Sequence, residues 1–369
     1  MHLAIDCRSV HTHMGGIGRA ALELVRALGA EPRGHRITMI VGAQAGEVSA
    51  RGVHILPVEA AMIDERFEQL QLPSLLEEIG ADVYLNTTFS VPAVKTTQRQ
   101  LSIIHDVVFE DRPEYVEPNL RSYLSRWSRF AAEHADHVLT VSDHARDRIR
   151  EVYAVDPSRI TRVYNGLPMT CFDPPTDDHI AHVRAKYNLD GPFVLYLGTV
   201  EIKKGIVELL QGFRRARDLG LGETLVLAGG RGGPPLDLED EIRLAGCVDR
   251  VRYLGYVDEG DKKPLLKAAG VFVYPSLYEG FGIPPLEAMA LGVPCVVSDQ
   301  TSLPEIVGSA ALVTPVREPG AFGEALLLAA RDDDFRRTAA VDGPARAREF
   351  SWASSASQVL DVCERMRRN

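Results

Sequence analysis

The chain has 369 residues, which is long for one domain and comfortable for two, and its composition of 45% hydrophobic and 25% charged residues is that of an ordinary globular protein. Its formal net charge of −10 argues against a nucleic-acid partner, because such binding depends on neutralising phosphates with Lys and Arg. No stretch is long and apolar enough to cross a bilayer and no signal peptide precedes the first strand pattern, so we expect a cytoplasmic protein whose membrane contact is at most peripheral.

Strand and helix patterns alternate through the first half of the chain. An apolar strand at residues 3–7 is followed by a loop and by a helix whose apolar residues recur at helical spacing as far as Gly29. Further candidate strands cover residues 37–41, 53–56, 83–85, 101–104, 138–141 and 160–164, and helical patterns between them include residues 64–79 and 120–133. This alternation predicts a parallel sheet covered by helices on both faces.

The alternation of strand and helix patterns is interrupted near residue 170, where a polar, proline-rich stretch indicates an interdomain linker. Alternation then resumes with candidate strands at residues 193–197, 225–228, 251–254, 271–274, 293–298 and 312–313. The predicted organisation is an N-terminal α/β domain at 1–170, a linker at 171–190, a second α/β domain at 191–350 and a C-terminal helix at 351–369.

Two other features have plain structural explanations. Asp332, Asp333 and Asp334 follow a helical run far from the other motifs, which indicates the polar start of the next helix rather than a metal site. The five cysteines are odd in number and widely spaced, so they indicate neither a disulfide framework nor zinc.

A glycine cluster, Gly15, Gly16 and Gly18, follows the first strand and opens the first helix. It is not a Gly-x-Gly-x-x-Gly motif, the loop before it is too long for a tight dinucleotide-binding turn, and no convincing acidic residue closes the second strand. An NAD-dependent dehydrogenase is therefore disfavoured. We favour a loop whose amides approach a diphosphate, and a plain helix N-terminus is the alternative.

His105 and Asp106 directly follow the apolar strand at 101–104. They therefore stand at the carboxyl end of a strand, where open α/β sheets place ligand sites. A lone histidine in such a position is more often structural, so a bond to a ligand hydroxyl is one of two interpretations at this point. Asp106 is expected to do no more than orient the histidine.

Lys203 and Lys204 lie where the chain enters a helix after the strand at 193–197. Lysine is unfavourable near the positive end of a helix dipole unless an anion is bound there, so we expect a phosphate site. Arg231 follows another strand end in a glycine-rich stretch, and contact with a ligand and a flexible surface loop are equally supported interpretations.

The stretch from Tyr274 to Glu305 predicts a binding loop that feeds a helix. Turn residues break the buried strand at 271–274, and Pro284 and Pro285 then start a helix that ends near Gly292.

Glu279 on this loop and Glu287 in the first helical turn have seven residues between them. Carboxylates accept hydrogen bonds from sugar hydroxyls, while the outward-facing amides of residues 280–283 and the helix start favour phosphate. The alternative is that Glu287 only complements the helix dipole and that Glu279 is a solvated loop charge.

The sequence Glu-Gly-Phe-Gly-Ile-Pro-Pro-Leu-Glu, followed by Ser-Leu-Pro-Glu, resembles the E-x7-E segment of the retaining GT-B glycosyltransferases of family 4, the group 1 glycosyl transferases. The likeness covers nearly the entire chain in family order and is to the branch that includes many mannosyltransferases. One departure is that Lys203 stands where the family has Arg, which loses a bidentate phosphate fork.

The resemblance implies the GT-B fold, with two Rossmann-like domains facing across a cleft and a C-terminal helix crossing back to the N-terminal domain. It implies a hexosyltransferase that moves a hexose from a nucleotide diphosphate sugar to an acceptor hydroxyl, with retention and without a metal or other cofactor. GDP-mannose is the first candidate donor, ahead of UDP-hexoses. The acceptor, whether glycan, lipid-linked or small molecule, and the oligomeric state are not identified.

The resemblance also assigns roles to individual residues. The expected catalytic residues are His105, which would contact the donor sugar from the other domain, Lys204, which would bind the diphosphate, and Glu279, which would hold sugar hydroxyls. Glu287 would hold the ribose. The expected donor-binding residues are Gly15, Gly16, Thr199, Lys203, Lys204, Arg231, Tyr256, Glu279, Gly280, Phe281, Gly282, Ile283 and Glu287.

Two alternatives belong to other functional classes. A GT-B-shaped nucleotide-sugar epimerase would need general acid and base residues at the sugar, and a non-catalytic sugar-nucleotide-binding subunit would be expected to have lost His105, Lys204 or Glu279. Nucleotide release on addition of an acceptor separates a transferase from both.

Overall fold

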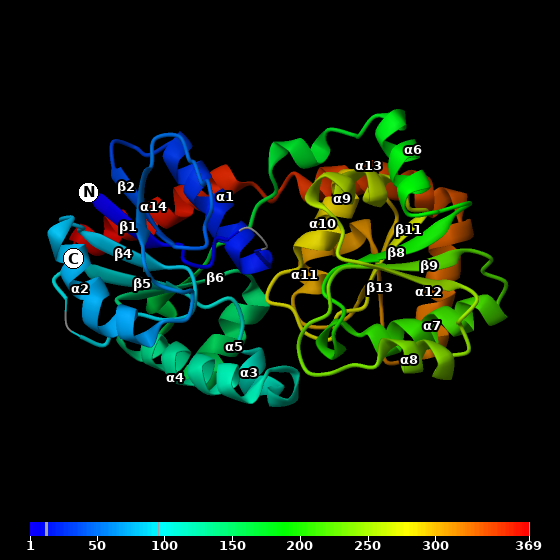
Figure 1. The fold of residues 1–369 in the computed structure, drawn as a ribbon, viewed down its shortest axis with the longest axis horizontal. Coiled ribbons are helices and arrows are strands. Elements are labelled where there is room, and N and C mark those ends of the chain that lie inside the picture. The colour runs from blue at the N-terminus through cyan, green and yellow to red at the C-terminus, as the bar shows by residue number, and fades with distance from the viewer. Residues whose placement is uncertain (12–13, 95, 369) are drawn as a thin grey trace. The chain divides into compact units, whose positions relative to one another are not determined.

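The computed structural model describes residues 1–11, 14–94 and 96–368. The chain divides into two compact units (Figure 1). Unit 1 comprises Met1–Asp111, Pro118–Pro168 and Phe350–Asn369, and unit 2 comprises Arg112–Glu117 and Met169–Glu349.

Over the residues that the structure describes, unit 1 contains a sheet of seven parallel strands in the order β3-β2-β1-β4-β5-β6-β7. Its strands are β1 (His2–Asp6), β2 (Arg36–Gly42), β3 (His54–Val58), β4 (Val83–Asn86), β5 (Arg99–Ile103), β6 (His137–Thr140) and β7 (Ile160–Arg162). Its α-helices are α1 (Gly16–Ala30), α2 (Leu72–Glu78), α3 (Val108–Asp111), α4 (Pro118–His134), α5 (Asp143–Tyr153) and α14 (Trp352–Arg368).

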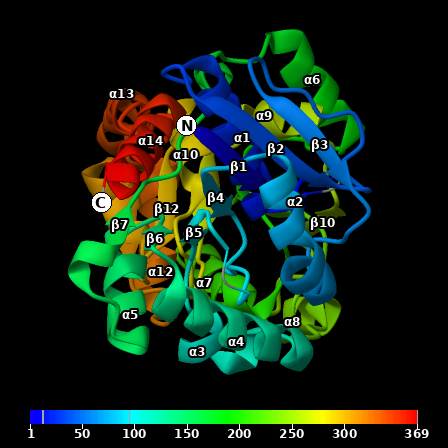
Figure 2. The same cartoon turned by 90° about the vertical axis from the view of Figure 1, so that its left-hand side faces the viewer.

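The strand order of unit 1 explains how its helices cover the sheet. The chain moves outward from β1 to β2 in one direction and from β4 to β7 in the other, and right-handed crossovers then place α1 on one face and α4 and α5 on the opposite face (Figure 2). Both faces are therefore shielded from water, and the central strands carry fully buried residues such as Leu3, Ile5 and Leu85. This is the parallel, doubly covered sheet that the sequence predicts.

Unit 2 contains a second parallel sheet, which has six strands within the described residues, in the order β10-β9-β8-β11-β12-β13. Its strands are β8 (Phe193–Leu197), β9 (Thr224–Ala228), β10 (Val251–Gly255), β11 (Val271–Tyr274), β12 (Cys295–Ser298) and β13 (Leu312–Thr314). Its α-helices are α6 (Asp177–Lys186), α7 (Ile206–Asp218), α8 (Leu238–Leu244), α9 (Glu259–Ala268), α10 (Ile283–Ala290), α11 (Leu303–Val307), α12 (Pro319–Arg331) and α13 (Asp333–Ala347).

The region expected to be a linker, 171–190, holds the helix α6 and packs within unit 2. Lys186 Nζ lies 2.6 Å from an Asp261 carboxylate oxygen on α9, and the Tyr187 hydroxyl donates to the same carboxylate at 2.9 Å. Thr176 caps the helix, because its hydroxyl accepts the His179 amide. The polar composition of this stretch therefore reflects an exposed capped helix.

The helix predicted at residues 64–79 is present, since residues 65–78 are helical without a break. Within it, Phe67–Gln71 forms a π-helix, η1, and α2 begins at Leu72 with Pro73 in its first turn. Proline has no amide to donate to the preceding turn, which explains the change of hydrogen-bond pattern at this point.

The prediction for the aspartate triplet is confirmed. Asp332 is the N-cap of α13 and accepts the Phe335 amide at 2.8 Å, while Asp333 and Asp334 lie in the first turn. No helix in the described part of the chain is both long and apolar enough to span a membrane.

Candidate active site

Lys204 and Glu279 form an ion pair in unit 2, although 75 positions separate them in the sequence. Lys204 ends the 3-10 turn η5 (Ile202–Lys204) after β8, and Glu279 lies in the loop after β11, the parallel neighbour of β8. The Lys204 Nζ atom lies 2.6 Å from Glu279 Oε1 and 3.5 Å from the Tyr274 hydroxyl, and the paired side chains are only 14% and 13% exposed. The structure thus joins two residues that the sequence predicts separately.

The ion pair keeps the Glu279 carboxylate charged although it is buried. Burial acts to raise the pKa of this carboxyl, but the Lys204 ammonium, helped by Lys203, outweighs burial and lowers the pKa from its ordinary value of 4.5. A negative charge is therefore fixed next to a positive one at the carboxyl ends of two adjacent strands, where open α/β sheets bind ligands.

The backbone of the Glu279 loop is held by two consecutive hydroxyl residues. Thr301 Oγ1 accepts the Glu279 amide at 3.0 Å. Ser302 Oγ lies 3.0 Å from the Glu279 carbonyl oxygen and 2.8 Å from that of Phe281, so its one hydroxyl hydrogen is shared between these two acceptors. Both main-chain groups of Glu279 are consequently used inside the protein.

The amides that follow Glu279 are arranged differently. No acceptor in the described parts of the chain bonds the amides of Gly280, Gly282 or Ile283. Gly282 has φ of 108°, and an added Cβ there would lie 2.6 Å from Leu303 Cδ2, so only glycine fits. These amides lie at the start of α10, where the sequence predicts an anion-binding loop.

The helix α10 begins at Ile283, one residue before the predicted Pro284. The left-handed conformation of Gly282 allows the chain to turn into the helix at this earlier position. Glu287 is therefore half-buried in the second turn and not in the first turn as predicted, which places it farther from the positive end of the helix.

The two lysines lie on η5 and not in the first turn of α7, which begins at Ile206. Lys203 Nζ lies 3.7 Å from Glu201 Oε1, so each lysine has a carboxylate neighbour. Gly205 separates η5 from α7 with φ of 69°, and a side chain there would overlap the Pro275 carbonyl oxygen. This close approach holds η5 against the strand end that leads to Glu279.

Three other predicted donor-binding residues lie on exposed segments of unit 2. The Thr199 carbonyl accepts a hydrogen bond from the Tyr196 hydroxyl at 2.6 Å, and Thr199 itself is exposed. Arg231 is paired with Glu239 of α8. Tyr256 is 57% exposed and follows β10.

In unit 1, Gly15 is the N-cap of α1, and both Gly15 and Gly16 are exposed with open space around an added Cβ. Gly18 is the glycine that packing requires, because a Cβ there would overlap the Ser9 carbonyl oxygen. The exposed amides at 15 and 16 are compatible with both interpretations that the sequence leaves open.

His105 is buried in unit 1 and bonded through Nε2 to the Thr87 carbonyl oxygen at 2.9 Å. A carbonyl only accepts, so Nε2 carries the proton. Burial lowers the imidazole pKa, partly opposed by the Thr87 carbonyl and by Asp106, so the ring is neutral near pH 7. Asp106 does not orient the ring as expected, because its Oδ1 accepts the Val108 amide at 3.0 Å.

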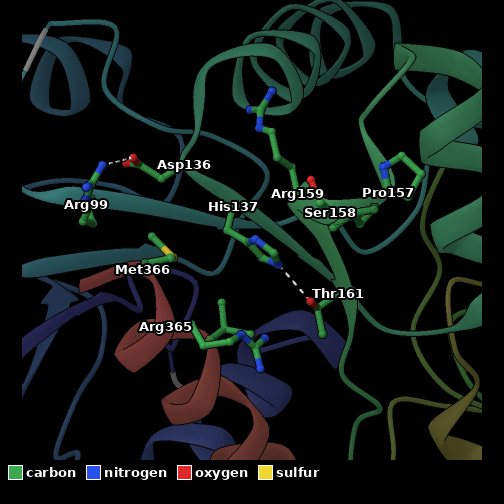
Figure 3. Close-up of a pocket in the computed structure, with 11 residues that line it drawn as sticks. Arg99, Asp136, His137, Pro157, Ser158, Arg159, Thr161, Arg365 and Met366 are labelled. Atoms are coloured by element: carbon green, nitrogen blue, oxygen red, sulfur yellow. Dashed lines mark hydrogen bonds and ion pairs between the residues drawn. The ribbon is translucent and has the colours of Figure 1, made fainter. Parts of the chain in front are cut away.

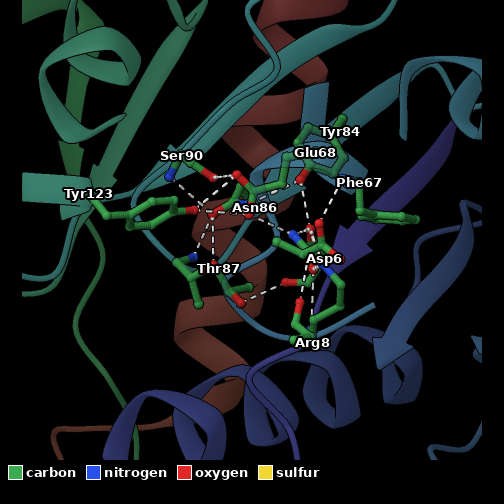
Figure 4. Close-up of polar contacts among 12 residues, drawn as sticks. Asp6, Arg8, Phe67, Glu68, Tyr84, Asn86, Thr87, Ser90 and Tyr123 are labelled. Carbon is green, nitrogen blue, oxygen red and sulfur yellow. Dashed lines mark hydrogen bonds and ion pairs between the residues drawn. The ribbon is translucent and has the colours of Figure 1, made fainter. Parts of the chain in front are cut away.

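A buried polar network, drawn in Figure 4, is joined to this histidine through Thr87. The Arg8 guanidinium, 1% exposed, bonds Asp6 and Glu68, each at 2.9 Å. The Tyr123 hydroxyl lies 3.0 Å from both Glu68 carboxylate oxygens. Thr87 links the network to His105, because its hydroxyl donates to the Asp6 carbonyl at 2.6 Å while its own carbonyl accepts from the histidine.

Sequence reasoning missed this network. The local signal in the sequence is the pair of charged residues Asp6 and Arg8, which stands directly at the end of an apolar strand. Ligands of open α/β sheets bind at this end of the strands, so a charged pair there indicates a candidate site. The distant partners Glu68 and Tyr123 carry no local signal. Burial raises the pKa of the Glu68 carboxyl, and the opposing Arg8 charge does not fully compensate.

The pocket shown in Figure 3, of about 420 Å³, lies at the opposite edge of the unit 1 sheet. It is lined by the amino-terminal ends of β5, β6 and β7, whereas His105 follows the carboxyl end of β5. Arg99 is paired with Asp136 at 2.9 Å, and Arg159 donates to the Ala135 carbonyl at 2.6 Å. This pocket therefore lies away from the strand ends that carry the predicted site residues, and we do not assign it to the active site.

The fold is shared with solved glycosyltransferase structures. The chain matches Anabaena Alr3699/HepE in complex with UDP-glucose with a TM-score of 0.76 at 16% sequence identity, over 99% of each chain. The two parallel sheets with their helices and this structural likeness show the GT-B fold, which confirms the predicted fold class.

Family models and relatives agree with this class. The model "Glycosyltransferase Family 4" matches residues 14–170, and "Glycosyl transferases group 1" matches residues 180–344. O-antigen chain mannosyltransferase B of Escherichia coli is 34% identical over 288 residues, which cover 76% of this chain and 73% of that protein. Serotype-specific mannosyltransferase WbdA of Escherichia coli is 28% identical over 289 residues, 76% of this chain, but the match spans only 35% of WbdA. The chain belongs to the group 1 glycosyltransferases, and its enzyme class is that of a hexosyltransferase.

Proposed function

We propose that this glycosyltransferase moves a hexose from a nucleotide diphosphate sugar to an acceptor hydroxyl, with retention at the anomeric carbon and without a metal ion. The observation that carries the proposal is the Lys204–Glu279 pair, 2.6 Å apart beyond the carboxyl ends of β8 and β11, on the loop that continues to Gly282 and Ile283. A cation and two amides suit a diphosphate, and a fixed carboxylate suits sugar hydroxyls.

In the proposed reaction, the bond between the anomeric carbon and the diphosphate oxygen breaks while the acceptor oxygen bonds the same face of the sugar. The acceptor proton passes to the leaving phosphate oxygen. Negative charge grows on the diphosphate as the bond breaks, and Lys204 and the amides at the start of α10 stabilise it. No protein nucleophile is required.

Glu279 then has the role of holding sugar hydroxyls, and Glu287 that of holding the ribose. We assign His105 to the hexose as a neutral hydrogen-bonding group, since its pKa is lowered by burial. Lys203, Thr199, Arg231 and Tyr256 stay in the proposed donor-binding set.

The proposed donor is GDP-mannose, with UDP-hexoses second. Mannose is supported by the names of the two Escherichia coli relatives, while the solved structure with UDP-glucose supports a nucleotide diphosphate sugar in general. The acceptor is left open among glycans, lipid-linked sugars and small molecules.

The test starts with a thermal-shift panel of GDP, UDP, ADP and their hexose conjugates, because a ligand that binds the folded state raises its melting temperature. The best donor is then incubated with candidate acceptors, and nucleotide release and the anomeric configuration of the product are measured with and without EDTA. We expect acceptor-dependent nucleotide release, an α-linked product from an α-linked donor, and no effect of EDTA.

Three other outcomes contradict parts of the proposal. Interconversion of two sugar nucleotides without acceptor would identify an epimerase. Binding without turnover across the acceptor panel would favour a non-catalytic subunit. Loss of activity in EDTA that Mg²⁺ or Mn²⁺ restores would contradict metal independence.

A further inference from the structure

Thr301 adopts a backbone conformation that β-branched residues avoid. Its φ is +52°, in the left-handed region, and it is the β-branched residue with positive φ among the described residues of the chain. Steric contact of the side chain with the backbone makes this conformation costly for any residue but glycine, and more so when Cβ carries two substituents. Such a residue persists only where the surrounding structure requires it.

The conformation aims the Thr301 hydroxyl at the loop that carries Glu279. Thr301 Oγ1 accepts the Glu279 amide at 3.0 Å, and the next residue, Ser302, contacts the Glu279 carbonyl oxygen at 3.0 Å. Ser298, at the end of β12, donates to the Ser276 carbonyl at 2.5 Å. Three hydroxyls from one turn therefore hold the backbone of one loop.

The loop needs such support because it has no secondary structure of its own. It runs from the end of β11 at Tyr274 to the start of α10 at Ile283. The Glu279 side chain is also drawn toward Lys204 by the 2.6 Å ion pair. With the amide and the carbonyl both fixed, the position of the carboxylate is set by the protein and not by a ligand.

We infer that Thr301 is a positioning residue for the glycosyl transfer reaction, whose hydroxyl holds the Glu279 backbone so that the carboxylate and Lys204 keep their geometry toward the donor. The inference rests on the proposed function for its effect on turnover. A displacement of about 1 Å in a reacting group costs on the order of 100-fold in rate, so loss of the hydroxyl is expected to act mainly on kcat.

Three substitutions separate the hydroxyl from the backbone strain. Thr301→Ser keeps the hydroxyl and removes one branch at Cβ. Thr301→Val keeps the branched shape and removes the hydroxyl. Thr301→Gly removes the hydroxyl and also relieves the strain, because glycine accepts positive φ at no steric cost. Ala154→Gly serves as a matched control, since Ala154 has φ of +53° at the C-terminal end of α5 in unit 1.

The experiment measures kcat and the donor KM of each variant with the best donor and acceptor, together with its melting temperature. We expect Thr301→Ser to keep kcat within about threefold, and Thr301→Val and Thr301→Gly to lose about 10- to 100-fold in kcat with little change in KM. The Gly variant is expected to melt no lower than the Ser variant, and Ala154→Gly to leave kcat unchanged.

The inference is overturned if Thr301→Gly keeps wild-type kcat, or if kcat follows melting temperature across all the variants. A second measurement is independent of turnover: hydrogen exchange of the Glu279 amide is expected to be at least tenfold faster in the Val and Gly variants than in wild type and Ser. If the wild-type protein releases no nucleotide with any acceptor, the proposed function fails. The exchange measurement still tests the inference in that case, because equal exchange rates of the Glu279 amide in wild type and in the Val and Gly variants would show that the Thr301 hydroxyl does not fix the Glu279 backbone.

Discussion

The ring of Tyr196 stacks on the ring of Tyr274, with centroids 6.0 Å apart and planes 12° from parallel. The two rings are fully buried on the neighbouring strands β8 and β11. Their hydroxyls diverge: Tyr196 donates to the Thr199 carbonyl at 2.6 Å, and the Tyr274 hydroxyl lies 3.5 Å from Lys204 Nζ. The stack therefore supports both segments that lead to the proposed diphosphate site.

This arrangement predicts that Tyr274→Phe lowers kcat by about tenfold, because a buried hydroxyl next to the Lys204 ammonium is removed while the ring is kept. Tyr196→Phe is the matched control, since the same atom is lost from the same stack without direct contact to Lys204. Steady-state kinetics and thermal unfolding of both variants test the prediction. Equal losses of kcat in the two variants would show that the stack acts only through stability.

Replacing Lys204 by Met is expected to abolish most of the activity, with kcat/KM at least about 100-fold lower, because the cation that stabilises the leaving diphosphate is lost. It also leaves the Glu279 carboxylate buried without its partner, so we expect a loss of about 3 kcal/mol in the free energy of unfolding.

The double variant Lys204→Met with Glu279→Gln separates these two effects. Removing both charges should recover most of the unfolding free energy while turnover stays low. Urea unfolding and nucleotide-release assays on the two single variants and the double variant are the measurements. Wild-type turnover in Lys204→Met would refute the assignment of this residue.

The pKa of Glu279 predicts how acid affects stability. A carboxyl whose pKa is lowered on folding stabilises the native state fully above its unfolded pKa, about 4.5, and loses that contribution as the pH falls through the lower folded value. The difference in unfolding free energy between wild type and Glu279→Gln should therefore be constant above about pH 5.5 and shrink below pH 4.5. A difference that shrinks between pH 6 and 8 instead would show that the Glu279 pKa is raised.

His105 predicts a dependence of the same sign in a higher pH range. Its pKa is lowered on folding, so the unfolded chain takes up a proton first, and stability falls as the pH drops below about 6.5 toward the folded pKa. His105→Gln, which can still donate to the Thr87 carbonyl, should keep the fold, lose about tenfold in kcat and remove this pH dependence. Imidazole NMR titration and pH-dependent unfolding are the measurements. A histidine that titrates at or above 6.5 in the native protein would contradict the prediction.

The fold was predictable where burial on both faces leaves a short, uninterrupted apolar run. The strands β8 and β11 have the predicted bounds, Phe193–Leu197 and Val271–Tyr274. The helix expected at 64–79 is present, but its hydrogen-bond pattern could not be predicted, because the periodicity of apolar residues does not report the π-helix at Phe67–Gln71.

The candidate site was predictable only residue by residue. Lys204 and Glu279 each carry a local signal, but their ion pair depends on β8 lying next to β11 in the sheet, which no local pattern contains. The hold of Thr301 on Glu279 likewise spans 22 positions. Arg8 and Glu68 were missed for the same reason, since 60 positions separate them and burial alone makes their pairing necessary.

The helix α14 completes unit 1 although it follows unit 2 in the chain. Its Ser355 hydroxyl donates to the Tyr164 carbonyl at 2.6 Å, and Val359, Leu360 and Cys363 are fully buried. A ribosome has therefore made all of unit 2 before the apolar surface that α14 covers in unit 1 can be closed. Until α14 is synthesised, unit 1 therefore exposes part of its apolar core, and we expect chaperones to bind it during translation.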